Sequence, residues 1–175
     1  MSNSLASSPA LPMAHGLLRV LVFLNWLVGA AILVLLVVSP HEEWILRAFK
    51  LTPSPESDRL VVALRVIALF GLICVPINRV ILKRLLAMVD SAREGNPFVA
   101  DNAQRLRTIA WCLLILQLIS IVIGEIAKSV STSAHPVHLD AGFSFTGWLA
   151  VLLTFLLAGV FAEGTKMRDD LEGMV

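Results

Sequence analysis

Two charged residues lie inside long apolar runs, and their positions suggest an interaction. Arg65 lies about five residues into a run that begins at Leu60, and Glu125 lies near the end of a run that begins near Thr108. At a helical rise of about 1.5 Å per residue, the two side chains would lie at similar depths. We predict an ion pair between Arg65 and Glu125. It is either structural, with Arg65 alternatively extending to the surface, or it forms polar stations of a small channel or transporter together with Gln117.

Other residue types that commonly carry chemistry are sparse. His135, His138 and Asp140 have a spacing that could bind a metal ion, but two histidines in a loop are more often solvated. Cys74 and Cys112 both lie in apolar runs, which favours buried thiols over a disulfide or metal site. The sequence contains no Ser/His/Asp set and no glycine-rich phosphate loop. We therefore expect no enzymatic activity, no cofactor and no bound metal.

The composition indicates what surrounds these residues. The chain has 175 residues, of which 57% are hydrophobic and 15% are charged. A soluble core of this size could not bury so much apolar surface, so the sequence predicts an integral membrane protein in contact with the lipid bilayer. A net charge of +1 gives no indication of direct nucleic-acid binding. Residues 1–16 are predicted to form a disordered tail, and residues 17–175 a single transmembrane domain.

Four apolar runs are long enough to cross a bilayer, which requires about 20 residues. They cover residues 17–38, 60–82, 108–127 and 143–162. Pro76 lies inside the second run and should kink that helix. The predicted fold is an all-α membrane protein, an up-down bundle of four transmembrane helices with a cytoplasmic helical hairpin between the second and the third.

The distribution of lysine and arginine predicts the orientation. Nine of these residues lie in the N-terminal flank, the central loop and the C-terminal tail, against four in the two other loops. Because basic loops resist translocation, both termini and the central loop should be cytoplasmic, in a plasma (inner) membrane.

The central segment, residues 83–107, has the features of a helical hairpin. Apolar residues continue at helical spacing beyond the second span, and Gly95 and Pro97 then mark the helix end. A new helix is expected near Asp101, whose carboxylate could cap it, with Gln104 placed three residues later to reciprocate.

The same segment carries a resemblance to a known family. The stretch SAREGNPFVADNAQRLRTIAW resembles the central motif of the DUF2975 family of small prokaryotic membrane proteins. The ending VFAEGTKMRDDLEGMV is similar to the ending of that family, and the resemblance extends from Leu17 onward. The matching residues are Gly95, Pro97, Phe98, Asn102, Leu106 and Arg107, followed by Phe161, Gly164, Leu171 and Val175.

The resemblance implies a partner but no catalytic residues. Such proteins are often encoded beside a Cro/repressor-type helix-turn-helix regulator, which suggests a non-enzymatic membrane partner or sensor of that regulator. The expected docking residues are Gly95, Pro97, Phe98, Asn102 and Arg107. A structural subunit of a larger membrane complex is a further possibility.

Two features of this segment leave alternatives open. Its basic residues either bind anionic lipid headgroups or dock an acidic partner surface. Phe98 packs either within the hairpin or against an amphipathic tail helix, which would contact it through residues such as Phe161 and Met167.

Overall fold

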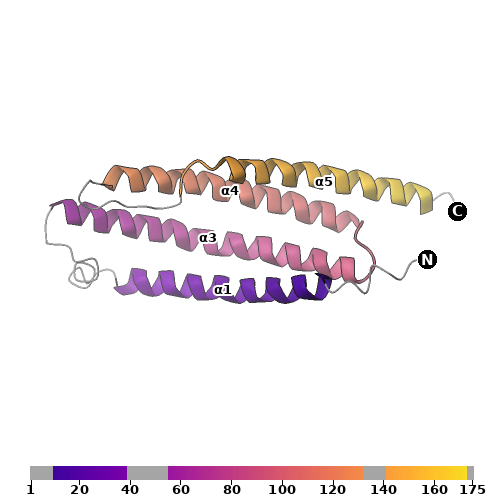
Figure 1. Cartoon of the computed structure of the whole chain (residues 1–175), viewed down its shortest axis with the longest axis horizontal. Coiled ribbons are helices and arrows are strands. Elements are labelled where there is room, and N and C mark those ends of the chain that lie inside the picture. The colour runs from indigo at the N-terminus through magenta and orange to yellow at the C-terminus, as the bar shows by residue number, and fades with distance from the viewer. Residues whose placement is uncertain (1–9, 39–54, 132–140, 173–175) are drawn as a thin grey trace. The chain divides into compact units, whose positions relative to one another are not determined.

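The computed structural model describes residues 10–38, 55–131 and 141–172 of the chain. Within these residues the protein is all-helical, with four helices and no strand. The helices are α1 (Ala10–Val38), α3 (Pro55–Arg93), α4 (Ala100–Val130) and α5 (Phe145–Glu172), labelled in Figure 1. This confirms the predicted all-α class with four long apolar helices.

Each helix is long and apolar enough to cross a membrane. The four candidate spans are Leu11–Val38, Asp58–Arg93, Ala100–Val130 and Phe145–Arg168, and an 18-residue stretch within each has a mean hydropathy of 2.8, 2.7, 2.3 and 2.1, respectively. The apolar side chains point mostly outward: Leu17 and Phe23 are 61% and 66% exposed. Such a surface is unfavourable in water but is satisfied by lipid, so the chain is consistent with a multi-pass membrane protein.

The start of α1 corrects one prediction. We expected a disordered tail as far as residue 16, but α1 begins at Ala10. Pro12 falls in its first turn, where backbone N–H groups have no helical acceptor and a proline therefore removes no hydrogen bond. Ala10, Leu11 and Met13 are also strong helix formers. The remainder of the predicted tail, residues 1–9, lies outside the described residues.

The three later helices continue beyond their predicted spans. α3 contains Pro76 and still runs for 39 residues to Arg93, as the helical spacing after Leu82 indicates. α4 includes the predicted hairpin helix together with the third span, and α5 includes the fourth span and most of the predicted tail helix. The hairpin segment is therefore formed by the ends of the same helices that carry the apolar spans.

The helices divide into two compact units. Unit 1 comprises Met1–Asn25, Ile77–Ile115 and Phe145–Val175, and unit 2 comprises Trp26–Pro76 and Leu116–Ser144. Unit 1 therefore contains the α3–α4 turn and α5, whereas unit 2 contains the other halves of α1, α3 and α4.

Candidate functional site

The conformation of Gly95 and two backbone hydrogen bonds fix the turn that ends α3. Gly95 has a φ of +83°, in the left-handed region that glycine adopts without steric cost. Its N–H donates to the carbonyl of Ala92 (3.2 Å), and the N–H of Asn96 donates to the carbonyl of Ser91 (3.0 Å). This pair of bonds is a Schellman motif, which satisfies carbonyls at the helix end. The predicted helix-ending role of Gly95 is confirmed.

The start of α4 differs in detail from its prediction. The helix begins at Ala100, and the carbonyl of Val99 accepts the N–H of Asn102 at 2.9 Å. Asp101 therefore lies inside the first turn instead of at the capping position. Its carboxylate oxygen Oδ2 lies 3.5 Å from Nη2 of Arg105, one turn further along. A carboxylate in this turn is still favoured by the helix dipole.

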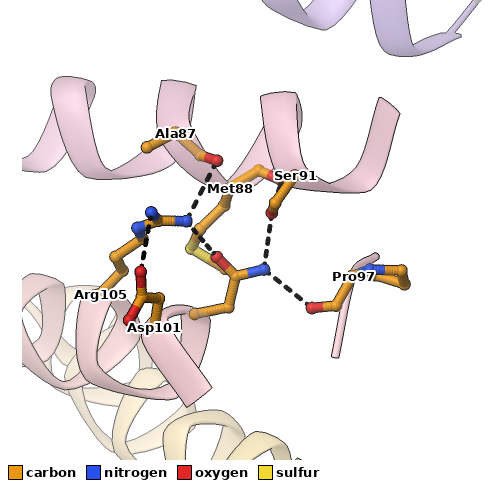
Figure 2. Close-up of polar contacts among 7 residues, drawn as sticks. Ala87, Met88, Ser91, Pro97, Asp101 and Arg105 are labelled. Atoms are coloured by element: carbon orange, nitrogen blue, oxygen red, sulfur yellow. Dashed lines mark hydrogen bonds and ion pairs between the residues drawn. The ribbon is translucent and has the colours of Figure 1, made fainter. Parts of the chain in front are cut away.

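Asn102 joins the two helices. It is only 1% exposed, and its side chain is the largest among the described residues to be fully buried. Its Nδ2 donates to Ser91 Oγ and to the carbonyl of Pro97, both at 2.8 Å. In Figure 2 these two bonds are the dashed lines that end at the labelled Ser91 and Pro97. A buried amide in an apolar protein is costly unless it is paired, and here both of its polar atoms have partners.

Arg105 completes this group of bonds. Its Nη1 donates to Asn102 Oδ1 (2.8 Å) and to the carbonyl of Ala87 (3.3 Å), as Figure 2 also shows. Ser91 Oγ in turn donates to the carbonyl of Met88 at 2.9 Å. We call Ser91, Asn102 and Arg105 the turn network. The sequence pointed to Asn102 but not to Ser91 or Arg105, because their roles depend on which residues face one another across the turn.

Aromatic packing connects the turn to α5. The ring of Phe98 lies 5.2 Å from that of Phe161, at an interplanar angle of 34°. A Cβ added at Gly164 would lie 3.4 Å from the Phe98 ring, so the small residue lets the ring approach the helix. Arg168 Nη1 also donates to Asn96 Oδ1 at 3.4 Å. Of the two alternatives for Phe98, packing against the C-terminal helix is the one observed.

His15 of α1 makes a contact that was not predicted. Its Nδ1 lies 2.9 Å from Asp90 Oδ1 in α3, and its side chain is 15% exposed. Arg93 Nη1 lies 3.9 Å from the same carboxylate oxygen. We had assigned His15 to a disordered tail, so the sequence offered no signal for this contact. It adds α1 to the elements that hold the end of α3.

Arg107 lies away from the turn network. It is exposed and lines a groove between α4 and α5 in unit 1, together with Gln104 of α4 and Phe155 of α5. Four of the five predicted docking residues lie at the turn: Gly95, Pro97, Phe98 and Asn102. The fifth, Arg107, lines the groove instead.

In unit 2, Arg65 and Glu125 remain a predicted pair. Arg65 is half-buried in α3, whereas the Glu125 side chain is 66% exposed. Glu125 Oε1 accepts from Lys128 Nζ at 2.8 Å, one turn along α4. Gln117, the third proposed polar station, is 8% exposed.

The segment that leads into α5 approaches α4 very closely in unit 2. Ser120 Oγ accepts the N–H of Gly142 at 3.2 Å. Gly142 has a φ of +124°, which favours glycine. A Cβ added at Gly124 would lie 2.6 Å from the Gly142 Cα and 2.8 Å from the carbonyl oxygen of Ala141. Only glycine at position 124 permits this backbone contact.

The predicted metal-binding residues, His135, His138 and Asp140, lie outside the described residues. Within the part of the chain that the structure describes, no three His, Cys, Asp or Glu side chains are grouped closely enough to hold a metal ion. Cys74 and Cys112 are both free thiols.

Comparison with known proteins identifies the family. Neither the curated proteins nor the solved structures include one that matches this chain. The model of the family described as "Protein of unknown function (DUF2975)" matches residues 47–175, which include the whole α3–α4 turn and α5. The chain therefore belongs to the DUF2975 family, as the motif around Gly95 and Asn102 indicated.

Proposed function

We propose that this protein is a non-enzymatic membrane partner of a helix-turn-helix transcriptional regulator. The regulator would bind a docking surface formed by Asn96, Pro97 and Phe98 at the turn and by Phe161 and Arg168 of α5. The proposal concerns binding alone, since the contacts at the turn pair and pack side chains without placing a nucleophile beside a base.

The observation that carries the proposal is an exposed aromatic ring on a fixed turn. Phe98 is 46% exposed although one side of its ring packs against Phe161. The Schellman motif at Gly95 and the buried Asn102 restrict the backbone on either side of the ring. An aromatic side chain that is ordered before binding loses little entropy in a complex, which is typical of binding hot spots.

The charge around the turn supports a partner with an acidic surface. Lys83, Arg84 and Arg93 are exposed near the end of α3. Basic side chains at the rim of an interface accelerate association with an acidic protein and contribute to specificity. The family resemblance implies that such a partner is a small Cro/repressor-type regulator.

The proposed docking requires the turn to face the cytoplasm. The excess of lysine and arginine on the side of both termini and the α3–α4 turn supports this orientation, with the other loops on the outer side of a plasma membrane. A reporter fused at Asn96 should be active only from the cytoplasm. A reporter active only from the exterior would place the docking surface in the wrong compartment and end the proposal.

A capture assay tests whether the regulator binds this protein. The detergent-solubilised full chain is immobilised, and binding of the regulator encoded by the neighbouring gene is measured. Phe98→Ala should weaken capture by roughly fivefold or more, as loss of a hot-spot ring does. Phe145→Ala is the matched control, because Phe145 is 74% exposed at the start of α5 and lies outside the docking surface. Equal capture by the wild type and Phe98→Ala would refute the proposed surface.

A further inference from the structure

A groove separates α4 and α5 within unit 1. It has a volume of about 330 Å³ and is lined by eight residues, five of which are alanine or glycine. α4 contributes Ala100, Ala103, Gln104 and Arg107, and α5 contributes Phe155, Ala158, Gly159 and Ala162.

Aromatic contacts lie at the two ends of the groove. Phe98 packs on Phe161 at one end, and Trp111 packs edge-on against Phe155 at the other, with ring centroids 5.4 Å apart. The residues between these two contacts are too small to fill the space, and a Cβ added at Gly159 would meet no atom within 4 Å.

The groove lies at a level where α5 is strongly apolar on its outer side. Leu156 and Val160 flank the groove residues of α5 and are 59% and 63% exposed. Both belong to the candidate span Phe145–Arg168. Side chains of this kind are stable only against lipid, so acyl chains should reach the mouth of the groove.

Arg107 places a positive charge in this apolar setting. Across the described residues, no hydrogen bond or ion pair involves its guanidinium group. The nearby carboxylates have other partners, since Asp101 pairs with Arg105 and Glu163 pairs with Lys166. A guanidinium group at the edge of the apolar layer attracts anions, and it binds phosphate through two charge-assisted hydrogen bonds.

We propose that the groove binds one anionic phospholipid, with its phosphate on Arg107 and an acyl chain along the small residues of α5. The groove supplies an apolar channel beside a single unpaired cation, which is the chemistry of a lipid with a negative headgroup. A zwitterionic lipid carries its own cation, which competes with Arg107 for the phosphate. The site is separate from the turn network and does not depend on the regulator.

Fluorescence quenching by brominated lipid tests this proposal. Trp111 packs on Phe155, a groove residue, and is 52% exposed. Replacing the three other tryptophans, Trp26, Trp44 and Trp148, with phenylalanine leaves Trp111 as the reporter in the full chain. The protein is reconstituted in phosphatidylcholine vesicles with increasing fractions of brominated phosphatidylglycerol or brominated phosphatidylcholine.

In the Trp111 reporter protein, brominated phosphatidylglycerol should reach half of its maximal quenching at a roughly fivefold lower fraction than brominated phosphatidylcholine. Arg107→Gln should abolish this preference. Arg84→Gln is the matched control, because Arg84 is also exposed but does not line the groove, and it should retain the preference. Equal quenching by the two lipids, or a preference that survives Arg107→Gln, would overturn the proposal.

A second variant tests the acyl part of the site. Gly159→Leu extends a side chain into the groove from a position where an added Cβ meets no atom within 4 Å, and the groove has room for the remaining atoms, so the fold should tolerate it. It should reduce the preference for phosphatidylglycerol to the same extent as Arg107→Gln. If Gly159→Leu left the preference unchanged, the lipid would not occupy the groove. Asn96→Ala changes the docking surface at a residue that does not line the groove, and it should retain the preference, which separates this site from regulator docking.

Discussion

The two ends of α4 are held to their neighbours in opposite ways. At the α3–α4 turn, a buried polar side chain connects α4 to its neighbours, because Asn102 donates hydrogen bonds to Ser91 and to the carbonyl of Pro97. In unit 2, contact depends on the absence of side chains, because Gly124 lies directly against Gly142. The first arrangement depends on matching donors and acceptors, and the second on steric fit. Removing hydrogen bonds at the turn should therefore lower the free energy of unfolding in steps. Adding any atom at the contact between Gly124 and Gly142 should lower it sharply.

The largest effect is expected where a side chain is added to the close contact. Gly124→Ala would place a Cβ 2.6 Å from the backbone of Gly142, and a neighbouring backbone cannot move as a flexible side chain can. We expect a loss of about 3 kcal/mol in the free energy of unfolding. The measurement is unfolding of the detergent-solubilised protein by titration with sodium dodecyl sulfate.

Gly159→Ala is the control for this variant, since it makes the same chemical change in a helix with open space around it. It should be neutral or stabilising by up to about 1 kcal/mol, because alanine favours helix more than glycine does. Similar losses for both glycines would show that the contact at Gly124 is not tight.

Removing the central amide should have the next largest effect. Asn102→Ala leaves Ser91 Oγ and the Pro97 carbonyl without this donor and removes one acceptor from Arg105. We expect a loss of about 2 kcal/mol in the same titration. Ser91→Ala removes only one of these partners and should cost about 1 kcal/mol. If Ser91→Ala lowered the free energy of unfolding as much as Asn102→Ala, the expected stepwise loss of stability in the turn network would be contradicted.

A change in the turn backbone should have a smaller effect. Gly95→Ala forces a side chain into a φ of +83°, where the added Cβ meets no neighbouring atom. The backbone conformation alone should therefore lower the free energy of unfolding, by about 1 kcal/mol. Gly16→Ala is a suitable reference, because a Cβ at Gly16 also meets nothing within 4 Å and no positive φ is involved. Equal stability of the two variants would contradict the conformational explanation.

The smallest effect concerns Glu125. Its pairing with Lys128 is exposed, so Glu125→Gln should change the free energy of unfolding by less than about 0.5 kcal/mol. Breaking a buried pair with Arg65 would instead cost about 3 kcal/mol or more. The same titration therefore decides whether the predicted pair between Arg65 and Glu125 holds unit 2 together.

The sequence predicted elements well and contacts poorly, for identifiable reasons. The four apolar runs and the stop at Gly95 and Pro97 depend on local composition and conformation, which neighbouring residues specify. The partners of Asn102, and the contact between His15 and Asp90, depend on residues 11 and 75 positions apart in the chain. No periodicity within one helix encodes such a pairing.

The start of α1 is another feature that the sequence did not predict. Pro12 and the polar residues before it resembled a tail, although a proline in a first turn is compatible with helix. The groove was also missed, because small residues at helical spacing indicate close packing as readily as a gap. The contacts of Phe98 and Trp111 at its two ends join residues far apart in the chain, so they could not be read from that spacing.

The unbroken length of α3 has a mechanical consequence. With 39 residues it extends for about 58 Å, roughly twice the thickness of the hydrocarbon layer. The same helix contains Leu60, close to its first turn, and Ser91, to which Asn102 donates a hydrogen bond. A rotation of the C-terminal half of α3 about the helix axis would carry Ser91 away from the amide that it binds, so the bonds of Asn102 also fix the rotational position of that half of the helix.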